Sequence, residues 1–364
     1  MQDVPRTMKA VLLTGHGGFD RLQYRDDVPV PVPRTGEVLV RVGAAGVNNT
    51  DINTRTGWYS RAVQDGTTAA AGAAGHAAAD VADSGWTGAA PAFPRIQGAD
   101  ACGRIVAVGP AVDPGRIGTR VLIEPVFRPA GAGLGEAVYF GSERDGAFAE
   151  FACVPAVHAH PIVSALSDAE LASFPCSYSA AENMLTRAGV AAGERVLVTG
   201  ASGGVGSAAV QLARRRGAAV VAVAAAAKAA AVTALGAATV IPRGADLLAA
   251  LGAESVDVVI DVVGGAVFPA LLGLLRRGGR YAVAGAIAGP LVQLDLRTLY
   301  LKDLRLIGCT VLEPEVFGTL VRAIEHGEIR PLVAATFPLS AIVAAQQAFL
   351  EKQHTGKIVL LPAS

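Results

Sequence analysis

The stretch RVLVTGASGGVGSAAVQLA at residues 195–213 joins an apolar run, a cluster of glycines and a segment with helical apolar periodicity. The apolar run ends at Thr199, and glycines follow at 200, 203, 204 and 206. Glycines let the backbone turn tightly and approach a pyrophosphate, and a helix N-terminus offers N–H donors and a positive dipole end. The spacing G-x-x-G-x-x-G is less usual than G-x-G-x-x-G, so the prediction depends on the strand–turn–helix context. We predict a dinucleotide-binding loop whose contacts come from Gly200, Ser202, Gly203, Gly204, Val205 and Gly206.

The sequence on either side of this loop predicts the architecture. Residues 178–310 alternate helical patterns with continuous apolar runs such as VDVVIDVV at 256–263, which is typical of a doubly wound parallel sheet covered on both faces. Residues 1–177 contain short alternating runs separated by Gly and Pro, which indicate a β-rich domain. Residues 311–364 hold two helical patterns and end in a strand, KIVLLP at 357–362. We expect this strand to return to the first domain.

The second strand of this domain, which follows the glycine-rich loop and its helix, bears on the choice between NADH and NADPH. An acid that binds the ribose of NAD is expected about 20 residues on, at the end of that strand. The strand AAVVAVAAAAK at 218–228 ends near Ala224 without a carboxylate, and Lys228 follows, placed to meet a 2′-phosphate. The alternative is that Lys228 is only a solvated residue at a helix start. This pattern favours NADPH over NADH.

Composition excludes several classes of partner. The 364 residues include 31 basic and 31 acidic side chains, and this balance lacks the basic stripe of a nucleic-acid-binding protein. The alanine-rich segment at 217–241 is interrupted by Lys228 and lacks the hydrophobicity of a membrane span, and the N-terminus has no signal-peptide pattern. Four scattered cysteines without a CxxC pair fit a reducing compartment. We therefore expect a soluble, cytoplasmic protein without nucleic-acid or membrane partners.

Several motifs resemble the medium-chain dehydrogenase/reductase superfamily, and more narrowly its zinc-free quinone oxidoreductase-like (zeta-crystallin-like) branch. Besides the glycine loop, they are GEVLVRVGAAGVNNTD at 36–51, GADACGRIVAVG at 98–109 and HTGKIVLLP at 354–362. The resemblance implies an α/β protein with a GroES-like β-rich catalytic domain, residues 1–177, and a Rossmann NADPH-binding domain, residues 178–310. It also implies that residues 311–364 complete the catalytic domain and that copies pair through the Rossmann sheet edge as a homodimer or homotetramer.

The same resemblance allows the zinc-ligand positions of the family to be compared with the residues of this chain. Zinc alcohol dehydrogenases of this superfamily carry Cys where this chain has Asn48, and a His-Glu pair where it has Ala99 and Asp100. Their third ligand, a Cys, is matched by Cys176. Because catalytic zinc needs three protein ligands, we predict no metal site and place Cys176 in the pocket or core. The alternative is an atypical metal site in which Cys176 is joined by Asp100 and a histidine.

The resemblance also implies roles for residues outside the glycine loop. Asn48 is expected to hydrogen-bond the nicotinamide ribose or carboxamide, and Lys357 to reach the cofactor from the returning tail. Tyr59 matches a tyrosine near the substrate; it donates a hydrogen bond or proton to the enolate, or it only lines the pocket while water is the acid. The backbone beside the nicotinamide is expected to be that of Gly285, Ala286 and Ile287.

An Ala/Gly-rich insertion at residues 62–94 separates Tyr59 from the next family motif and contains Trp86. Such a composition predicts a long loop, because it buries little apolar surface to offset its ordering entropy. Both flanks approach the pocket implied by the resemblance. The loop is therefore either a lid that sets substrate size through Trp86 or a surface excursion.

These features together predict a reaction. Without a metal to polarise an alcohol or ketone, hydride delivery suits a carbon that is already electrophilic, as in a quinone or the β-carbon of an enone. The cofactor carries the hydride, and the protein orients it and stabilises the developing oxyanion. We predict a zinc-independent, NADPH-dependent quinone or enone reductase. The alternatives are an alcohol dehydrogenase with an atypical metal site and a protein that binds NADPH without turnover.

Overall fold

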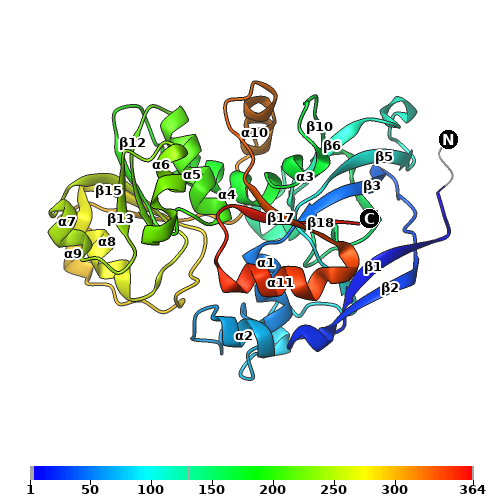
Figure 1. Ribbon diagram of the computed structural model, residues 1–364, viewed down its shortest axis with the longest axis horizontal. Coiled ribbons are helices and arrows are strands. Elements are labelled where there is room, and N and C mark those ends of the chain that lie inside the picture. The colour runs from blue at the N-terminus through cyan, green and yellow to red at the C-terminus, as the bar shows by residue number, and fades with distance from the viewer. Residues whose placement is uncertain (1–3, 130, 363–364) are drawn as a thin grey trace.

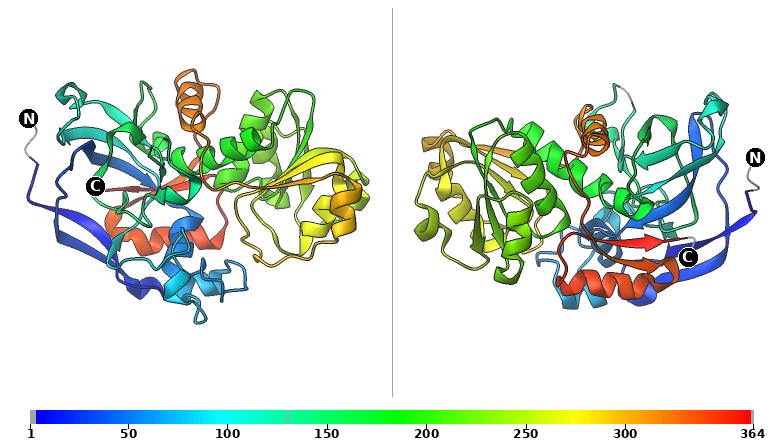
Figure 2. Two further views of the ribbon diagram at one scale, coloured as in Figure 1. Left: turned by 180° about the vertical axis from the view of Figure 1, so that it is seen from behind. Right: turned by 45° about the horizontal axis from the view of Figure 1, so that its top comes forward.

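The computed structural model describes residues 4–129 and 131–362, which form two bodies side by side (Figure 1). The N-terminal part of the chain forms a β-rich body, and the middle of the chain forms a body in which strands alternate with helices. The last elements, shown in red, cross back to the β-rich body, as the two further views also show (Figure 2). The predicted α/β fold class is confirmed.

The β-rich body contains two main sheets. A small sheet has the order β2-β1-β4, and a larger sheet has the order β10-β6-β5-β3-β18-β17, with β9 also paired to β3. The short strands β7 (Val126–Phe127) and β8 (Val138–Tyr139) form a separate pair. The strands of the two sheets are β1 (Thr7–Leu13), β2 (Leu22–Pro29), β3 (Glu37–Gly46), β4 (Arg95–Ile96), β5 (Cys102–Val108), β6 (Arg120–Ile123), β9 (Phe151–Pro155), β10 (Ala159–Pro161), β17 (Val333–Pro338) and β18 (Lys357–Leu361).

The second body is a six-stranded parallel sheet in the order β13-β12-β11-β14-β15-β16. This is the doubly wound order in which the strand sequence reverses beside β11, where such folds bind their ligands. The buried strand β11 carries Val196, Leu197 and Val198 with no exposed surface, because helices cover both faces. The strands are β11 (Arg195–Val198), β12 (Ala219–Ala224), β13 (Thr239–Pro242), β14 (Val256–Asp261), β15 (Leu275–Val283) and β16 (Arg305–Gly308).

Helices of both bodies cover the sheets and the junction. In the β-rich body, α11 contacts β17 and β18, while α3 contacts β3 and β5. At the junction, α4 packs against both α5 and α10. The helices are α1 (Asn49–Thr56), α2 (Ala69–Ala74), α3 (Asp168–Leu171), α4 (Pro175–Arg187), α5 (Gly204–Arg215), α6 (Ala229–Ala234), α7 (Leu247–Leu251), α8 (Phe268–Leu274), α9 (Leu296–Leu301), α10 (Val316–Glu325) and α11 (Ile342–Glu351).

Strand β18 returns to the β-rich body and decides which residues meet at the junction. It pairs antiparallel with β3, with Val359 opposite Gly46 and Leu360 opposite Ala45. Two residues further along the same antiparallel register, Lys357 stands across from Asn48, which immediately precedes α1. The backbone register therefore brings together two residues that are 309 positions apart in the chain.

The insertion at 62–94 is more regular than the predicted loop. It contains the short helix α2 and a 3-10 turn at Val81–Asp83. Gly72 of α2 lies so close to Leu350 of α11 that an added Cβ would come within 2.4 Å of its side chain. Glycine therefore supplies close packing here, which the low-complexity composition did not reveal.

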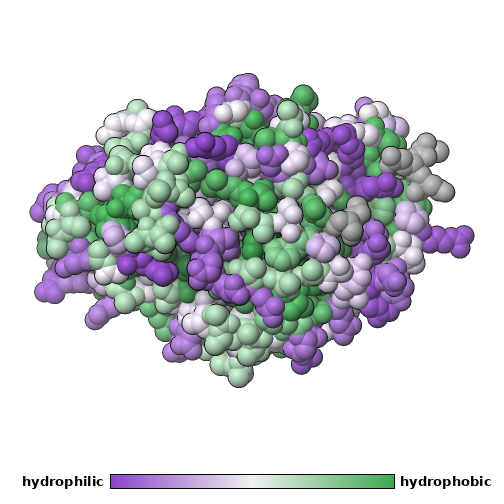
Figure 3. All heavy atoms as spheres, viewed as in Figure 1, coloured by the Kyte–Doolittle hydropathy of each residue, from purple (hydrophilic) through white to green (hydrophobic). Residues whose placement is uncertain are grey.

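The surface of the protein is mixed in character. Hydrophilic and hydrophobic residues are interspersed over the face of Figure 1 when it is drawn as spheres (Figure 3). Within the described residues, the helices are all too short or too polar to traverse a lipid bilayer.

Candidate active site

The glycine-rich loop joins β11 to α5 as the sequence predicted. Gly200 has a φ of 57°, a left-handed conformation that favours glycine. A Cβ on Gly206 would lie 2.2 Å from the carbonyl oxygen of Gly200, so this position needs glycine for close approach. Gly203 stands at the N-cap of α5, whose first N–H groups are not paired within the helix. The turn thus has the geometry of a pyrophosphate site.

A carboxylate that sequence reasoning missed braces this loop from the next strand. Asp261, at the end of β14, is fully buried. It accepts a hydrogen bond from Thr199 Oγ1 at the end of β11 and from the N–H of Val263, the latter at 2.8 Å. Tyr281 Oη also donates to it. Asp261 therefore ties the ends of β11, β14 and β15 together at the edge where the dinucleotide is predicted to bind.

Basic groups gather at the end of β12. Lys228 Nζ donates to the carbonyl oxygens of Lys352 and His354, at 2.6 and 2.5 Å. Lys352 Nζ donates to Asn49 Oδ1 at 3.1 Å and lies 3.7 Å from the centroid of the Phe349 ring. Burial, followed by the nearby charge of Lys228, lowers the pKa of Lys352 to about 8. Among the residues that the structure describes, neither lysine has a carboxylate within ion-pair distance, so this region suits an anion.

The positions equated with zinc ligands form a different kind of cluster, around an ammonium group. Lys357 Nζ donates to Asn48 Oδ1 and lies 2.7 Å from Asp100 Oδ2, with side chains 3% and 0% exposed. Asn48 Nδ2 donates to the same Asp100 oxygen at 2.8 Å. The N–H of Cys176 donates to Asp100 Oδ1 at 2.5 Å. One lysine, one carboxylate and one amide are therefore hydrogen-bonded to one another in the core of the junction.

This cluster changes what Asn48 and Lys357 can do. Both ends of the Asn48 amide are engaged by protein groups, because Nδ2 also donates to Gly46 O at 3.3 Å. The predicted contacts of Asn48 and Lys357 with the nicotinamide stay predictions. Asp100 was considered in the sequence only as a metal ligand. Its role as the partner of Lys357 follows from the pairing of β18 with β3, which no local pattern encodes.

No group of three His, Cys, Asp or Glu side chains within residues 4–129 and 131–362 lies close enough to hold a metal ion. Around Cys176, the neighbours are instead Tyr139 and Asp100. Burial raises the pKa of the Cys176 thiol to about 12. The donor set does not fit a catalytic zinc ion, which needs three protein ligands, because Asp100 is already paired with the Lys357 ammonium.

An aromatic group adjoins the ammonium cluster through Cys176. Tyr139 Oη and Cys176 Sγ are 3.0 Å apart, and the Trp86 ring of the insertion lies 4.9 Å from the Tyr139 ring. Tyr59 Oη donates to Thr50 Oγ1 at 3.0 Å, and burial raises the pKa of Tyr59 to about 12. Tyr139 was not found from the sequence, because it stands in a two-residue strand with no recognisable pattern.

The carboxylate of Asp51 caps the start of helix α1. It accepts from the N–H of Asn48 at 2.7 Å and from the N–H of Gly98 at 3.2 Å, in a capping box at the start of α1. Burial raises the pKa of Asp51 to about 7, against the opposing effect of these N–H groups and of Lys357. Asp51 therefore braces the turn that precedes α1. Because of this raised pKa, the Asp51 carboxyl group changes its charge near neutral pH.

The insertion touches the Rossmann body beside the predicted nicotinamide backbone. The N–H of Thr67 donates to the carbonyl oxygen of Ile287 at 2.9 Å. A Cβ on Gly66 would lie 2.5 Å from that same oxygen. The insertion thus bridges the two bodies at Ile287, one of the three residues predicted to lie beside the nicotinamide.

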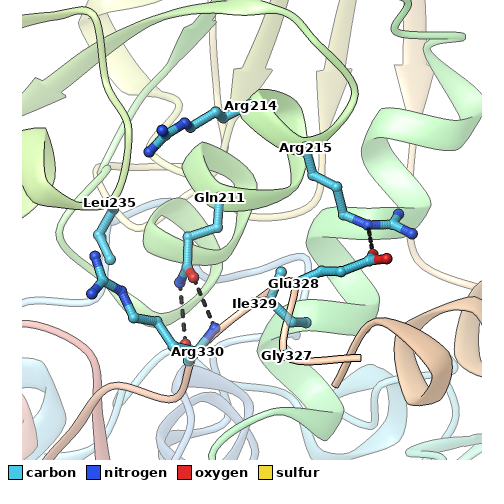
Figure 4. A pocket seen from close by; sticks show the side chains of 8 residues that line it. All are labelled: Gln211, Arg214, Arg215, Leu235, Gly327, Glu328, Ile329 and Arg330. Carbon is cyan, nitrogen blue, oxygen red and sulfur yellow. Dashed lines mark hydrogen bonds and ion pairs between the residues drawn. The ribbon is translucent and has the colours of Figure 1, made fainter. Parts of the chain in front are cut away.

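A surface pocket lies elsewhere, between α5 and the segment that follows α10 (Figure 4). Several of its polar side chains are already paired: Gln211 exchanges hydrogen bonds with the backbone of Arg330, and Arg215 pairs with Glu328. Gln211 also donates to Tyr178 Oη at 2.8 Å. These contacts fasten the returning tail to α5, and none of the candidate catalytic residues lines this pocket.

Comparisons with known proteins agree with this arrangement. Residues 34–164 match the alcohol dehydrogenase GroES-like domain, and residues 204–326 match the zinc-binding dehydrogenase family. The chain is 31% identical to an acryloyl-coenzyme A reductase of Metallosphaera sedula, over 97% of this chain and 99% of the relative. It is 29% identical to a quinone oxidoreductase of Lama guanicoe, over 98% of each chain.

Solved structures extend the comparison. The crystal structure of a candidate alcohol dehydrogenase from Sinorhizobium meliloti 1021 superimposes with a TM-score of 0.89 and 49% identity, covering 99% of this chain and 98% of the other. The 2-octenoyl-CoA carboxylase reductase CinF, in complex with NADP and 2-octenoyl-CoA, gives a TM-score of 0.82 at 26% identity, covering 99% of this chain and 88% of CinF. The fold and the site define a nicotinamide-dependent oxidoreductase. The chain belongs to the medium-chain dehydrogenase/reductase superfamily, as its motifs predicted, and its curated relatives include quinone oxidoreductases.

Proposed function

We propose that the protein is a zinc-independent, NADPH-dependent reductase of quinones or of carbon–carbon double bonds conjugated to a carbonyl. The observation that carries this proposal is the buried ion pair of Lys357 and Asp100, with Asn48, at the positions equated with zinc ligands. An ammonium group there repels a divalent cation.

The basic region at the end of β12 supports NADPH over NADH. Ala224 ends the strand where a ribose-binding acid would stand, and Lys228 and Lys352 carry charges without carboxylate partners among the described residues. An NADPH 2′-phosphate would meet two ammonium groups there. The NADP in the CinF complex supports the same choice by relationship.

The chemistry divides between cofactor and protein. NADPH, when bound, supplies a hydride that adds to the β-carbon of the acceptor, or to a quinone. The electron pair of the double bond then moves toward the carbonyl oxygen, and a proton completes the reduction. Tyr59 remains protonated at neutral pH, because its pKa is raised to about 12, so its Oη can donate that proton. The Trp86–Tyr139 pair, held by the bridging insertion, would limit the size of the acceptor.

Assembly and location form part of the same proposal. We propose a homodimer or homotetramer formed through the edge strand β16, beside which Leu296, Tyr300 and Leu306 are exposed at 64%, 62% and 40%. Exposed apolar groups of this kind favour a protein partner when they form a contiguous patch. Four free cysteines support a cytoplasmic location.

The test is NADPH consumption by metal-stripped protein with 1,4-benzoquinone, a panel of enones and an enoyl-CoA thioester, with NADH in parallel. Turnover that survives chelation and prefers NADPH is expected. Activity that returns only with added zinc would favour an alcohol dehydrogenase with an atypical metal site. Tight NADPH binding without turnover on any acceptor would favour a non-catalytic scaffold.

A further inference from the structure

The ammonium group of Lys357 has more donors than the protein satisfies. A lysine ammonium carries three N–H donors. Its acceptors in the described structure are Asn48 Oδ1 and Asp100 Oδ2, and the residue is only 2% exposed. A buried donor without a partner is costly, so a third donor is expected to have an acceptor that arrives with a ligand.

The position of this group points to what that ligand is. A Cβ added to Gly204 would lie 3.1 Å from Lys357 Cδ, so the lysine stem passes along the first turn of α5. The preceding residue, Gly356, donates its N–H to Ser202 O at 3.2 Å. The lysine is therefore fixed against the glycine-rich loop on one side.

On its other side, the cluster is continuous with the aromatic group. Asp100 accepts a hydrogen bond from the N–H of Cys176, and the Sγ atom of Cys176 contacts Tyr139 Oη. The ammonium thus lies between the loop that would hold the dinucleotide and the side chains that would hold the acceptor. A carbonyl oxygen of the acceptor is the chemical group that needs a hydrogen-bond donor at that place.

We propose that Lys357 is a catalytic residue whose remaining N–H donates to the carbonyl oxygen of the acceptor and stabilises the oxyanion that forms there. This inference rests on the proposed function and names the group that performs its electrostatic step. Asp100 and Asn48 are positioning residues: they hold the ammonium in one orientation before the acceptor arrives. Because the site is buried, the interaction is stronger than in water and needs little reorganisation.

The proposal has a consequence for the substrate class. A double bond with no conjugated oxygen offers nothing for the ammonium to contact. Quinones, enones and enoyl thioesters all place an oxygen where electron density accumulates when hydride is added to them. The contact with Lys357 therefore gives the physical reason why the acceptor of the proposed function is conjugated to a carbonyl.

The first experiment compares the wild type with Lys357→Met. The variant is expected to lower kcat for an enone on the order of 10²-fold to 10³-fold, as for removal of one oxyanion donor, with the KM for NADPH unchanged. A raised KM for NADPH at an unchanged kcat would overturn the proposal and make Lys357 a cofactor contact. Lys302→Met is the matched control, because Lys302 is also a largely buried lysine, whose Nζ donates to Leu272 O and Gly273 O in the Rossmann body.

The second readout needs no turnover. Bound 4-nitrophenol reports its ionisation by absorbance, and its phenolate oxygen imitates the oxyanion. The wild type and Lys302→Met are expected to favour the bound phenolate at a pH where free nitrophenol is largely protonated, and Lys357→Met is expected to lose this effect. Equal ionisation on the wild type and on Lys357→Met would overturn the proposal.

The two readouts separate this inference from the proposed function. If the wild type ionises nitrophenol through Lys357 but reduces no quinone or enone, the oxyanion site stands and the proposed reaction fails. If the wild type reduces enones but bound nitrophenol ionises equally on the wild type and on Lys357→Met, only the present inference fails. Should Lys357→Met not fold, the double variant Lys357→Met with Asp100→Asn removes both charges, keeps an acceptor for the N–H of Cys176, and carries the same nitrophenol test.

Discussion

The ion pair between Lys357 and Asp100 predicts a strong energetic coupling, which a double-mutant cycle would measure through stability alone. The pair is separated by 2.7 Å, and the two side chains are 3% and 0% exposed. Asp100→Asn leaves a buried ammonium without its carboxylate, and Lys357→Met leaves a buried carboxylate without its ammonium. The double variant leaves neither charge.

The magnitudes follow from burial. Removing one partner of a buried ion pair costs about 3–5 kcal/mol, because the remaining charge is uncompensated. At about 2–4 °C per kcal/mol for a domain of 150–250 residues, each single variant should unfold roughly 6–20 °C below the wild type. The double variant loses hydrogen bonds but buries no lone charge, so its cost should be about 1–2 kcal/mol. The coupling is therefore several kcal/mol.

The assay is urea unfolding followed by circular dichroism at pH 7, without cofactor, for the wild type and the three variants. Each single variant should have a lower midpoint than the double variant. Costs of the single variants that add, within about 0.5 kcal/mol, to that of the double variant would refute the reasoning. Such additivity would mean that the two charges are not coupled in the folded protein.

Three further predictions concern titration and proton transfer. Since the pKa of Lys352 is lowered to about 8, its ammonium group loses its charge as pH rises through 8. The affinity for NADPH, measured by fluorescence, should therefore fall between pH 7 and 9 in the wild type but not in Lys352→Met. An equal pH dependence in both proteins would contradict a role of Lys352 in binding NADPH. The pKa of Asp51 is raised to about 7 in the folded state, from 3.8, so its stabilising effect is complete below pH 3.8 and is lost as pH rises through 7. Relative to Asp51→Asn, the wild type should lose about 1.4 kcal/mol of unfolding free energy between pH 6 and 8, and a constant difference would refute the assignment. Tyr59→Phe should lower kcat about 10²-fold with the KM for NADPH unchanged, whereas an unchanged kcat would show that water is the acid.

The Rossmann body was predictable because its signals are local. Continuous apolar strands, the glycine positions and the helix after them are read from neighbouring residues, and their geometry does not depend on distant contacts. The close approach of Gly206 to Gly200 is an example, since both residues belong to one turn. The same locality made Lys228 visible at the end of β12.

The ammonium cluster was not predictable in that way, although part of its signal was present. The return of the final strand to the first domain was expected, but its partner strand and register were not. Only the pairing of Val359 with Gly46 places Lys357 opposite Asn48. Tyr139 and Lys352 carry no motif at all. Their importance follows from burial beside other polar groups, which is a property of the folded chain.

The return of β18 also sets the order in which the protein can mature. Lys357 follows Asn48 by 309 residues, and synthesis at about 5–20 residues per second separates their appearance by roughly 15–60 s. Until Lys357 is made, Asp100 lacks the ammonium group with which it pairs, and the edge of β3 that later receives β18 is unpaired. An open strand edge invites association with other chains. On the ribosome, the β-rich domain is therefore incomplete until β18 is made, and the cluster of Lys357, Asn48 and Asp100 forms only when that strand pairs with β3.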